Sequence, residues 1–314
     1  MLKIAMVGVG GITGAHIPAW DAMPDAELGA ICDIRPQRME PYPDKRHYLD
    51  FDEMLEKEEI DILDVCLPTY LHVEFVLKAL NKGINVLCEK PISLNKEDVK
   101  IVYEAAEKNN VKFMVAHVIR FWPEYEVVKK IYDERKYGKL LSGNMSRLSQ
   151  IPSWSWDNWM FDEDRSGLVP FDLHIHDFDF LVYAFGAPKN FKSYRSKLPE
   201  QDYFNAIYQF DGFFVSTEAS WYKASYPFTV GFRFQFENAV VEWKNNVLTV
   251  YECDGKKYNP IGAVANDTGD IGLPPSNAYA NEIRYFANCV INDTMPEKVK
   301  PDELETVIEI LKNL

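Results

Sequence analysis

A glycine-rich turn near the start of the chain constrains the fold more than any other stretch. It runs Gly8-Val9-Gly10-Gly11-Ile12-Thr13-Gly14, directly after an apolar run at residues 3–7 and directly before a helical stretch that ends near Trp20. A turn of this kind between a strand and a helix is typical of the first unit of a parallel α/β sheet. Gly8 allows the tight turn, and Gly10 lets the backbone approach a pyrophosphate at the helix N-terminus.

Short apolar runs alternate with helical patterns through about residue 118. We predict further strands at residues 28–32, 60–67, 84–87 and 111–116, and helices at residues 70–80 and 95–108. This alternation indicates a parallel sheet that is covered by helices on both faces. The proline-rich and charged residues 35–48 are interpreted as a surface connection, and His47 as a surface histidine.

The pattern changes to long alternating strands after residue 189. We predict an antiparallel meander at residues 203–210, 213–221, 232–236, 239–243 and 247–251, with Asp211-Gly212 as a two-residue hairpin and a turn at Asn245-Asn246 before the last of these strands. A strand at 140–151 and helices at 121–135 and 170–183 precede it; a loop at 260–275 and helices at 277–292 and 301–314 follow. Large apolar side chains on the outer sheet face favour a contact between subunits.

The predicted fold is therefore α/β with two domains. Residues 1–118 form a Rossmann dinucleotide-binding domain, and residues 119–314 form an α/β domain with a large, mostly antiparallel sheet. A chain of 314 residues is long enough for two cores.

Charge and cysteine content narrow the partners and the compartment. The net charge of −14 disfavours nucleic acid and anionic membranes, because phosphates would be repelled. The five cysteines show no CxxC spacing, which favours free thiols in a reducing compartment. No stretch resembles a signal peptide or is apolar over the length of a bilayer, so we expect a soluble cytoplasmic protein.

Asp33 closes the second predicted strand at about the distance expected for a ribose ligand. Its carboxylate would accept hydrogen bonds from a ribose diol and repel a 2′-phosphate, which favours NAD. Arg35 lies two residues on and could offset that charge, so NADP stays possible.

Cys88-Glu89-Lys90-Pro91 follows the strand predicted at residues 84–87. An ammonium at a buried strand end is costly unless it has a partner or a task. Pro91 ends the strand and fixes where Lys90 points. Most lysines are solvated surface groups, and for Lys90 taken alone a surface position is favoured over a functional one.

Asp172 and His176 are four residues apart on the helix that Pro170 is placed to begin. They share one helical face and can point at the same ligand. Asp172, His174 and His176 could instead suggest a metal site, but that spacing suits a strand rather than a helix, and we predict no metal.

Three tryptophans, Trp154, Trp156 and Trp159, lie within six residues. Exposed indoles suit the apolar faces of sugars, while a packed aromatic loop or a subunit contact is an equal alternative. Tyr279 could reach a substrate, although its helical stripe favours the core.

Together these motifs resemble the glucose-fructose oxidoreductase/inositol dehydrogenase (Gfo/Idh/MocA) family. The resemblance rests on the glycine turn with His16, on Leu67-Pro68-Thr69 with His72, on Glu89-Lys90-Pro91 and on Arg120-Phe121-Trp122-Pro123. It extends over nearly the whole chain, and the Glu-Lys-Pro triplet is its most specific element. Residues 172–179 are similar to the family's DxGxHxxD motif, with His174 in place of glycine.

The resemblance implies a site in which Lys90 lies by the nicotinamide and the reacting hydroxyl. Asp172 and His176 would lie opposite, with His176 as the acid/base, while His174 could add a substrate contact or alter the pocket. Whether Glu89 contacts a ligand or only braces the turn stays open. Predicted cofactor contacts are Gly8, Gly10, Gly11, Ile12, Thr13, Asp33, Arg35, Pro68, Thr69, His72, Glu89 and Lys90. Predicted substrate contacts are Lys90, Arg120, Trp154, Trp156, Asp172, His174, His176 and Tyr279.

The predicted function is NAD(P)-dependent, reversible oxidation of a secondary hydroxyl on a sugar, polyol or sugar derivative. His176 would take the proton, Lys90 would stabilise the developing charge, and Asp172 would orient the substrate or tune His176. The alternatives are an NAD-dependent glycoside hydrolase that works by transient oxidation and a non-catalytic NAD(P)-binding regulator. The family resemblance implies a homodimer or homotetramer formed through the C-terminal sheet.

Overall fold

The structure, a computed structural model, describes residues 1–262, 274 and 276–314. The described residues fall into two units. The first holds residues 1–118 and 276–305, and the second holds residues 119–262, 274 and 306–314. Most of the loop predicted at 260–275 therefore lies outside the described residues.

A six-stranded parallel sheet organises the first unit, with strand order β3-β2-β1-β4-β5-β6. Its strands are β1 (Leu2–Val7), β2 (Ala26–Cys32), β3 (Arg46–Tyr48), β4 (Ile62–Val65), β5 (Asn85–Glu89) and β6 (Phe113–Ala116). All residues of β4 and β6 are buried, as expected for strands with helices on both sides. The chain order reverses between β1 and β4, so the loops after these strands meet at a topological switch point.

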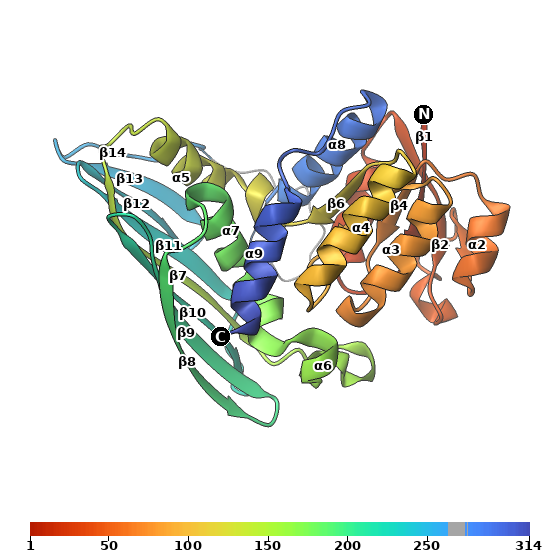
Figure 1. Cartoon of the computed structure of the whole chain (residues 1–314), viewed down its shortest axis with the longest axis horizontal. Helices are drawn as coiled ribbons and strands as arrows, with labels where there is room; N and C mark the ends of the chain where they lie inside the picture. Colours follow the sequence, from red (N-terminus) through yellow and green to blue (C-terminus); the bar gives the residue numbers. More distant parts are fainter. Residues whose placement is uncertain (263–273, 275) are drawn as a thin grey trace. The chain divides into compact units, whose positions relative to one another are not determined.

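The helices of this unit are α1 (Thr13–Asp21), α2 (Phe51–Lys57), α3 (His72–Asn81), α4 (Lys96–Lys108) and α8 (Ala278–Ile291), with short 3-10 turns at Pro36–Arg38 and Thr69–Leu71. Helices α3 and α4 lie side by side against the sheet (Figure 1). Helix α8 lies in the first unit, whereas the predicted division assigns all of residues 119–314 to the second domain.

Two elements of the first unit are absent from the prediction. Strand β3 lies in the stretch interpreted as a surface connection; it has three residues, none of them buried, and so no apolar pattern. Helix α2 begins after Asp50, whose side chain accepts a hydrogen bond from Glu53 N at 2.8 Å. His47 is exposed, as predicted.

The second unit contains an eight-stranded sheet of order β14-β13-β12-β11-β7-β10-β9-β8. The strands are β7 (Leu140–Gln150), β8 (Asn190–Leu198), β9 (Gln201–Gln209), β10 (Phe214–Tyr222), β11 (Thr229–Phe236), β12 (Ala239–Lys244), β13 (Val247–Glu252) and β14 (Lys257–Tyr258). The helices are α5 (Pro123–Asp133), α6 (Glu163–Ser166) and α7 (Ile175–Phe185), with 3-10 turns at Val118–Phe121, whose first residue belongs to the first unit, and at Trp156–Phe161, and a π-helical turn at Pro170–His174. Helix α9 (Pro301–Lys312) is divided: its residues up to 305 belong to the first unit and those from 306 to the second.

The predicted simple meander is wrong at β7. This strand lies between β10 and β11, parallel to β10 and antiparallel to β11. The insertion is possible because the chain returns from β7 to β8 through helices rather than through a hairpin. The sheet is still mostly antiparallel, as predicted, since β7–β10 is its one parallel pair among the described strands.

Both predicted tight turns of this sheet are confirmed. Gly212 has a φ of +88° between β9 and β10, where Phe210 N donates to Phe213 O at 2.9 Å. Asn245 and Asn246 have φ values of 50° and 61°, as a type I′ turn between β12 and β13 requires.

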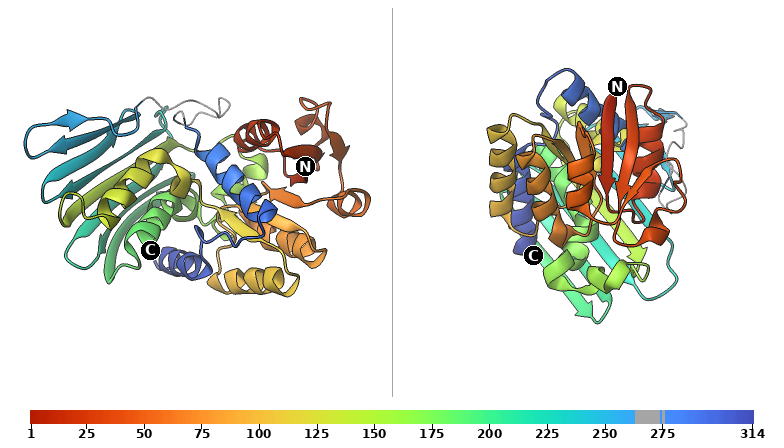
Figure 2. Two further views of the ribbon diagram at one scale, coloured as in Figure 1. Left: turned by 90° about the horizontal axis from the view of Figure 1, so that it is seen from above. Right: turned by 90° about the vertical axis from the view of Figure 1, so that its right-hand side faces the viewer.

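The two faces of the eight-stranded sheet differ. One face packs against α5 and α7 (Figures 1 and 2), with Tyr125 of α5 in edge contact with Phe180, Phe232 and Trp243. The exposed large side chains of the strands are Leu141, Tyr194, Leu198, Tyr203, Ile207, Phe214, Val247 and Tyr251. Polar residues such as Asn144, Arg233 and Gln235 are exposed among them, so the outer surface is mixed rather than uniformly apolar. No helix within the described residues is long and apolar enough to span a bilayer.

Candidate functional site

The glycine turn has the geometry of a nucleotide-binding loop. At Gly8, with a φ of +87°, an added Cβ would lie 2.5 Å from the carbonyl oxygen of Cys66, so the fold itself requires glycine. At Gly10, an added Cβ would meet no atom of the described chain within 4 Å. The chain's own packing therefore does not require the missing side chain at Gly10, and the open space fits a ligand that approaches the backbone.

Thr13 and the residues before it complete this turn. Thr13 is buried and its Oγ1 donates to Gly10 O at 2.7 Å, so the residue in the usual third-glycine position holds the loop. Gly11 is exposed and Ile12 is half-buried directly before α1 begins. Amides at this helix N-terminus are the groups that bind phosphate in such folds.

Asp33 is tied to the same loop. Its carboxylate accepts hydrogen bonds from Val9 N at 2.9 Å and from Arg35 N at 2.8 Å. The Arg35 guanidinium also donates to it, through Nε at 3.0 Å and Nη2 at 3.1 Å. Asp33 therefore braces the glycine turn, and Arg35 lies where its charge offsets that of the carboxylate.

The segment after β4 carries Pro68, Thr69 at the start of the 3-10 turn, and His72 at the start of α3. His72 is almost fully buried; its Nδ1 lies 2.7 Å from Pro91 O and its Nε2 lies 2.7 Å from Leu67 O. Burial lowers the pKa of His72, while the hydrogen bonds to the two carbonyls oppose that effect. Both ring nitrogens lie against backbone carbonyl oxygens of the protein itself, so the structure does not support the predicted cofactor contact of His72.

Lys90 is half-buried at the end of β5, and the Lys90–Pro91 peptide is cis. Glu89 beside it is buried and has both carboxylate oxygens engaged. Oε2 accepts a hydrogen bond from Lys90 N at 3.2 Å, and Oε1 lies 3.1 Å from His16 Nε2. These contacts show that Glu89 braces the turn, which is one of the two roles left open by the sequence.

Asp172 and His176 share an open side of their helical segment. From residue 168 to residue 182 these two are half-buried and every other residue is buried. The segment is not a continuous α-helix as predicted: it begins with a π-helical turn at Pro170–His174 and continues as α7. Such wide turns are often found at functional sites.

His174 lies in the core of the second unit. It has no exposed surface, its Nε2 lies 2.7 Å from the hydroxyl of Tyr208, and the two rings are nearly parallel at 5.8 Å. Burial lowers the pKa of His174 to about 3, so the ring is neutral. The structure does not support the predicted substrate contact of His174, which instead packs the helix against β9.

Arg120 is also a core residue. It has no exposed surface, and its guanidinium pairs with the Asp179 carboxylate through Nε–Oδ2 at 2.9 Å and Nη2–Oδ1 at 2.6 Å. A cation that is neutralised in this way is not available to a ligand, so the predicted substrate contact of Arg120 is not supported.

The aromatic candidates divide into two groups. Trp154 is 72% exposed and Trp156 is 39% exposed, so both indoles present surface to solvent. Tyr279 of α8 is nearly fully buried, with its ring centroid 5.8 Å from that of His16. Its position in the core of the first unit weakens the predicted substrate contact.

Two family models match the chain. The model for the oxidoreductase family with an NAD-binding Rossmann fold matches residues 2–117, and the model for the GFO/IDH/MocA C-terminal domain matches residues 125–242. The chain belongs to the Gfo/Idh/MocA family of oxidoreductases. Residues 2–117, which make up most of the first unit, match the NAD-binding Rossmann fold of that family, as predicted.

Curated relatives of this family include sugar and polyol dehydrogenases. Glucose-6-phosphate 3-dehydrogenase of Bacillus subtilis is 28% identical over 205 residues, covering 63% of this chain and 58% of the relative. Myo-inositol 2-dehydrogenase of Thermotoga maritima is 30% identical over 190 residues, covering 59% and 55%. The matches thus span little more than half the length of these relatives.

The fold is shared with solved structures of the family over almost the whole chain. Levoglucosan dehydrogenase, in complex with NADH and levoglucosan, superposes with a TM-score of 0.81 at 18% identity, covering 99% of this chain and 95% of that one. The likeness confirms the predicted combination of a Rossmann-type domain with a mostly antiparallel C-terminal sheet.

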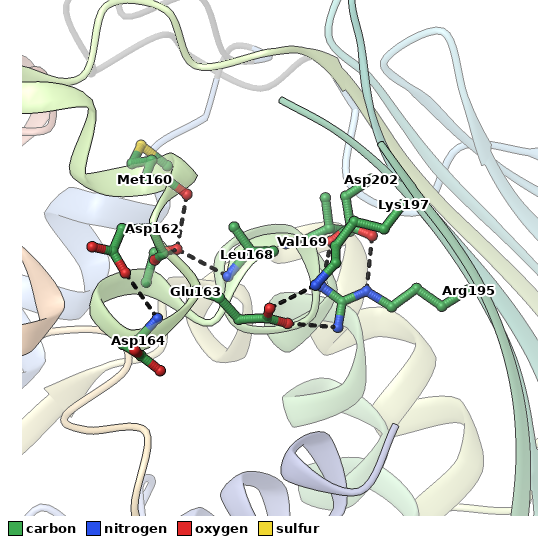
Figure 3. A network of polar contacts seen from close by, with 10 residues as sticks. Met160, Asp162, Glu163, Asp164, Leu168, Val169, Arg195, Lys197 and Asp202 are labelled. Atoms are coloured by element: carbon green, nitrogen blue, oxygen red, sulfur yellow. Dashed lines mark hydrogen bonds and ion pairs between the residues drawn. The ribbon is translucent and has the colours of Figure 1, made fainter. Parts of the chain in front are cut away.

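A hydrogen-bond network before the π-helical turn is absent from the prediction. Asp202 of β9 accepts from Val169 N at 3.2 Å and pairs with Arg195 of β8 at 2.7 Å (Figure 3). Leu168, next to Val169, has a φ of 57°, an unusual conformation for leucine that surrounding contacts must hold. The network anchors the chain directly before Asp172, and no local pattern in the sequence marks it.

Asp64 is another polar residue that the prediction omits, and its partner His16 is named there only as part of the family motif. Asp64 lies in β4 without exposed surface and accepts from Trp20 Nε1 at 2.7 Å and pairs with His16 Nδ1 at 2.9 Å. A charged residue inside an apolar strand-like run is a sequence signal that could have identified it. Ligand atoms of His16, Asp64 and Cys66 lie within 4.8 Å of one another, but direct hydrogen bonds account for the contacts of the carboxylate.

Proposed function

We propose that this protein is an NAD-dependent dehydrogenase that reversibly oxidises a secondary hydroxyl of a sugar, polyol or sugar derivative. The observation that carries the proposal is the exposure pattern at residues 168–182, where Asp172 and His176 alone remain partly open. An acid and a histidine that stay accessible in an otherwise buried helix suit proton transfer to a bound hydroxyl. The names of the relatives, glucose-6-phosphate 3-dehydrogenase and myo-inositol 2-dehydrogenase, support the substrate class.

The residues present fit a dinucleotide. The open approach at Gly10, the N-terminus of α1 and the Asp33 carboxylate would hold its pyrophosphate and ribose. A bound nicotinamide would supply the acceptor for the hydride that leaves the substrate carbon. The Asp33 carboxylate favours NAD, and the charge of Arg35, which offsets that of the carboxylate, leaves NADP as the alternative cofactor.

The side chains of the chain handle the hydroxyl proton. A ring nitrogen of His176 accepts the proton from the substrate oxygen as the carbon loses hydride, and returns it in the reverse reaction. The Nζ of Lys90 donates a hydrogen bond to the same oxygen and stabilises the negative charge that develops there. Asp172 orients the substrate or tunes His176.

The exposed tryptophans support substrate binding, the outer sheet face supports oligomer formation, and the cysteines bear on the compartment. Trp154 and Trp156 would stack on the apolar face of the substrate. The exposed apolar side chains of the eight-stranded sheet support a homodimer or homotetramer. All five cysteines are free thiols, which supports a reducing, cytoplasmic environment.

The test is a panel of sugars, polyols and their phosphates, incubated with NAD and followed by nicotinamide absorbance. We expect turnover with at least one member, and a loss of about 10²- to 10⁴-fold in kcat for Lys90→Met and His176→Ala. Both variants should still bind NADH, measured by fluorescence titration. Wild-type turnover in either variant would show that the site is assigned wrongly.

The same panel separates the alternatives. A nitrophenyl glycoside that is cleaved without net change in NAD would indicate the transient-oxidation hydrolase. NAD binding without turnover of any compound would indicate the regulator.

A further inference from the structure

Lys90 is flanked by two residues that are each held by a different buried histidine. Glu89, before it, contacts His16 from α1, and Pro91, after it, contacts His72 from the start of α3. Both histidines lie in the first unit, with exposures of 0% and 1%. Neither is used by the proposed proton transfer, so their burial at this turn needs another reason.

His16 bridges two carboxylates. Its Nδ1 lies 2.9 Å from Asp64 Oδ2 and its Nε2 lies 3.1 Å from Glu89 Oε1. A carboxylate only accepts hydrogen bonds, so both contacts are hydrogen bonds when both ring nitrogens carry protons. Other groups that face the ring are Cys66 Sγ at 3.6 Å and the Tyr279 ring.

The charge of His16 is consistent with this geometry. Burial, the largest single influence, disfavours the imidazolium, but the charges and hydrogen bonds of Asp64 and Cys66 together outweigh it and raise the pKa of His16 well above its usual value. The cation holds Asp64 of β4 and Glu89 of β5 together across two neighbouring strands. Because Glu89 Oε2 accepts from Lys90 N, the link ends at the backbone of the lysine.

His72 ties the other side of the turn. Its Nδ1 contacts Pro91 O and its Nε2 contacts Leu67 O, each at 2.7 Å. Both carbonyl oxygens only accept, and burial lowers the pKa of the ring, so the neutral ring donates through one nitrogen. With the proton on Nδ1, the side chain ties Pro91 to the start of α3, next to the loop that follows β4. The backbone of Lys90 is thus held on one side through Glu89 and on the other through Pro91.

We propose that His16 and His72 are positioning residues for Lys90: each clamps one neighbour of the lysine, to β4 or to the start of α3, and together they set the direction of its side chain. The proposal rests on the role of Lys90 in the proposed function. It explains why two polar rings are buried at this turn, and it predicts that only the ring nitrogen facing the Glu-Lys-Pro turn matters for Lys90.

Asparagine and glutamine separate the two nitrogens of each ring. The amide nitrogen of asparagine lies near the position of Nδ1, and that of glutamine near the position of Nε2. His16→Gln therefore keeps the bond to Glu89, whereas His16→Asn keeps only that to Asp64. At position 72 the pattern is reversed, because His72→Asn keeps the bond to Pro91 and His72→Gln keeps only that to Leu67.

The main readout is the titration of Lys90 itself, followed by NMR in protein labelled with ¹³Cε-lysine. The signal is assigned by its loss in Lys90→Met. Both variants of His16 lose the imidazolium charge, but only His16→Gln keeps the bond to Glu89, so we expect its Lys90 titration to stay closer to wild type than that of His16→Asn. We expect His72→Asn to keep the wild-type titration of Lys90 and His72→Gln to shift it. His47→Gln, at an exposed histidine, is the surface control and should change nothing.

Turnover should follow the same crossed pattern. With the best substrate of the panel, His16→Asn and His72→Gln should lower kcat about 10- to 100-fold, and their partners should lower it by less. The KM for NAD should stay near the wild-type value in all four variants. General damage to the core would affect both members of a pair alike, so equal Asn and Gln variants overturn the proposal.

One further variant and one combination of results keep the outcomes distinct. If an asparagine variant does not fold, Glu89→Gln tests the same link from the other side and should shift the Lys90 titration, because its amide group cannot accept at both positions. An unchanged Lys90 titration in Glu89→Gln overturns the proposal. A crossed NMR pattern in a protein that oxidises no compound would uphold the positioning and reject only the proposed function.

Discussion

The guanidinium of Arg120 and the carboxylate of Asp179 form a two-bond ion pair that has no exposed surface on either side chain. The guanidinium also lies over the ring of Tyr183, 4.8 Å from its centroid. A motif residue expected at the substrate is therefore part of the core of the second unit.

This pair predicts a stability effect rather than a binding effect. Asp179→Asn should cost about 3–5 kcal/mol in the free energy of unfolding, because it leaves a buried guanidinium without its counter-charge. The double variant Arg120→Met/Asp179→Leu should recover most of that loss. Urea unfolding measures both, and a rise in substrate KM without loss of stability would contradict the core assignment.

The two glycines of the nucleotide loop should respond differently to alanine. Gly8→Ala should destabilise the protein by about 3 kcal/mol or more, since its φ is +87° and the new Cβ would lie 2.5 Å from Cys66 O. Gly10→Ala should leave the melting temperature close to that of the wild type, because the added Cβ meets open space.

Although Gly10→Ala should not change stability, it should weaken the binding of the dinucleotide. The alanine methyl would occupy the approach of the pyrophosphate, so we expect NADH affinity to fall at least about 10-fold in Gly10→Ala, measured by fluorescence titration. Unchanged affinity in this variant would place the dinucleotide elsewhere.

Asp33 and Arg35 should together set the choice between NAD and NADP. Asp33→Asn keeps an oxygen for Val9 N–H but removes the charge, and it releases Arg35 to meet a 2′-phosphate. We expect the ratio of kcat/KM for NADP over NAD to rise at least about 10-fold. The gain should disappear in Asp33→Asn/Arg35→Ala; if it persists, Arg35 is not the phosphate partner.

His174 should make the protein acid-sensitive. Its pKa is about 3 in the folded state, against 6.5 for an unperturbed histidine, so between these values the unfolded chain binds a proton that the native state does not. This contribution to stability is present above about pH 6.5 and is lost as the pH falls toward 3, by about 1.4 kcal/mol per pH unit. His174→Phe should flatten the slope by about one proton in urea titrations across this range.

His16 should make the protein less stable as the pH rises, the opposite of the effect of His174. Its pKa is raised in the folded state, so the native protein keeps a proton that the unfolded chain releases above about pH 6.5. The stabilisation is full below that pH and is lost as the pH rises through the folded value. Wild type should therefore lose more stability than His16→Gln between pH 6.5 and pH 9; equal slopes would show that His16 is neutral.

Much of the fold follows from local patterns. The alternation of apolar runs and helical stretches predicts the parallel sheet, and Asp211-Gly212 and Asn245-Asn246 predict tight turns, because these signals lie within a few neighbouring residues. Strand β3 and the place of β7 in the sheet escape prediction, since an edge strand lacks an apolar pattern and strand order depends on partners far along the chain.

The residues of the candidate site likewise fall into those that local motifs predict and those whose location depends on burial. Residue identity and spacing single out the glycine turn, Asp33, Lys90, Asp172 and His176, since each belongs to a short motif with its own chemistry. Burial is not encoded in spacing, which is why Arg120 and His174 are placed at the substrate by their motifs and in the core by the structure.

The sequence by itself determines the family and the parallel first sheet, and it singles out the residues that we propose bind a dinucleotide and move a proton, because those features lie in contiguous segments. Only the tertiary structure decides which polar groups face one another. His16, Asp64 and Glu89 are 73 residues apart at their extremes, yet they form one hydrogen-bonded link. Such links arise because parallel strands bring distant carboxylates to neighbouring positions in the sheet, where burial obliges each to find a partner.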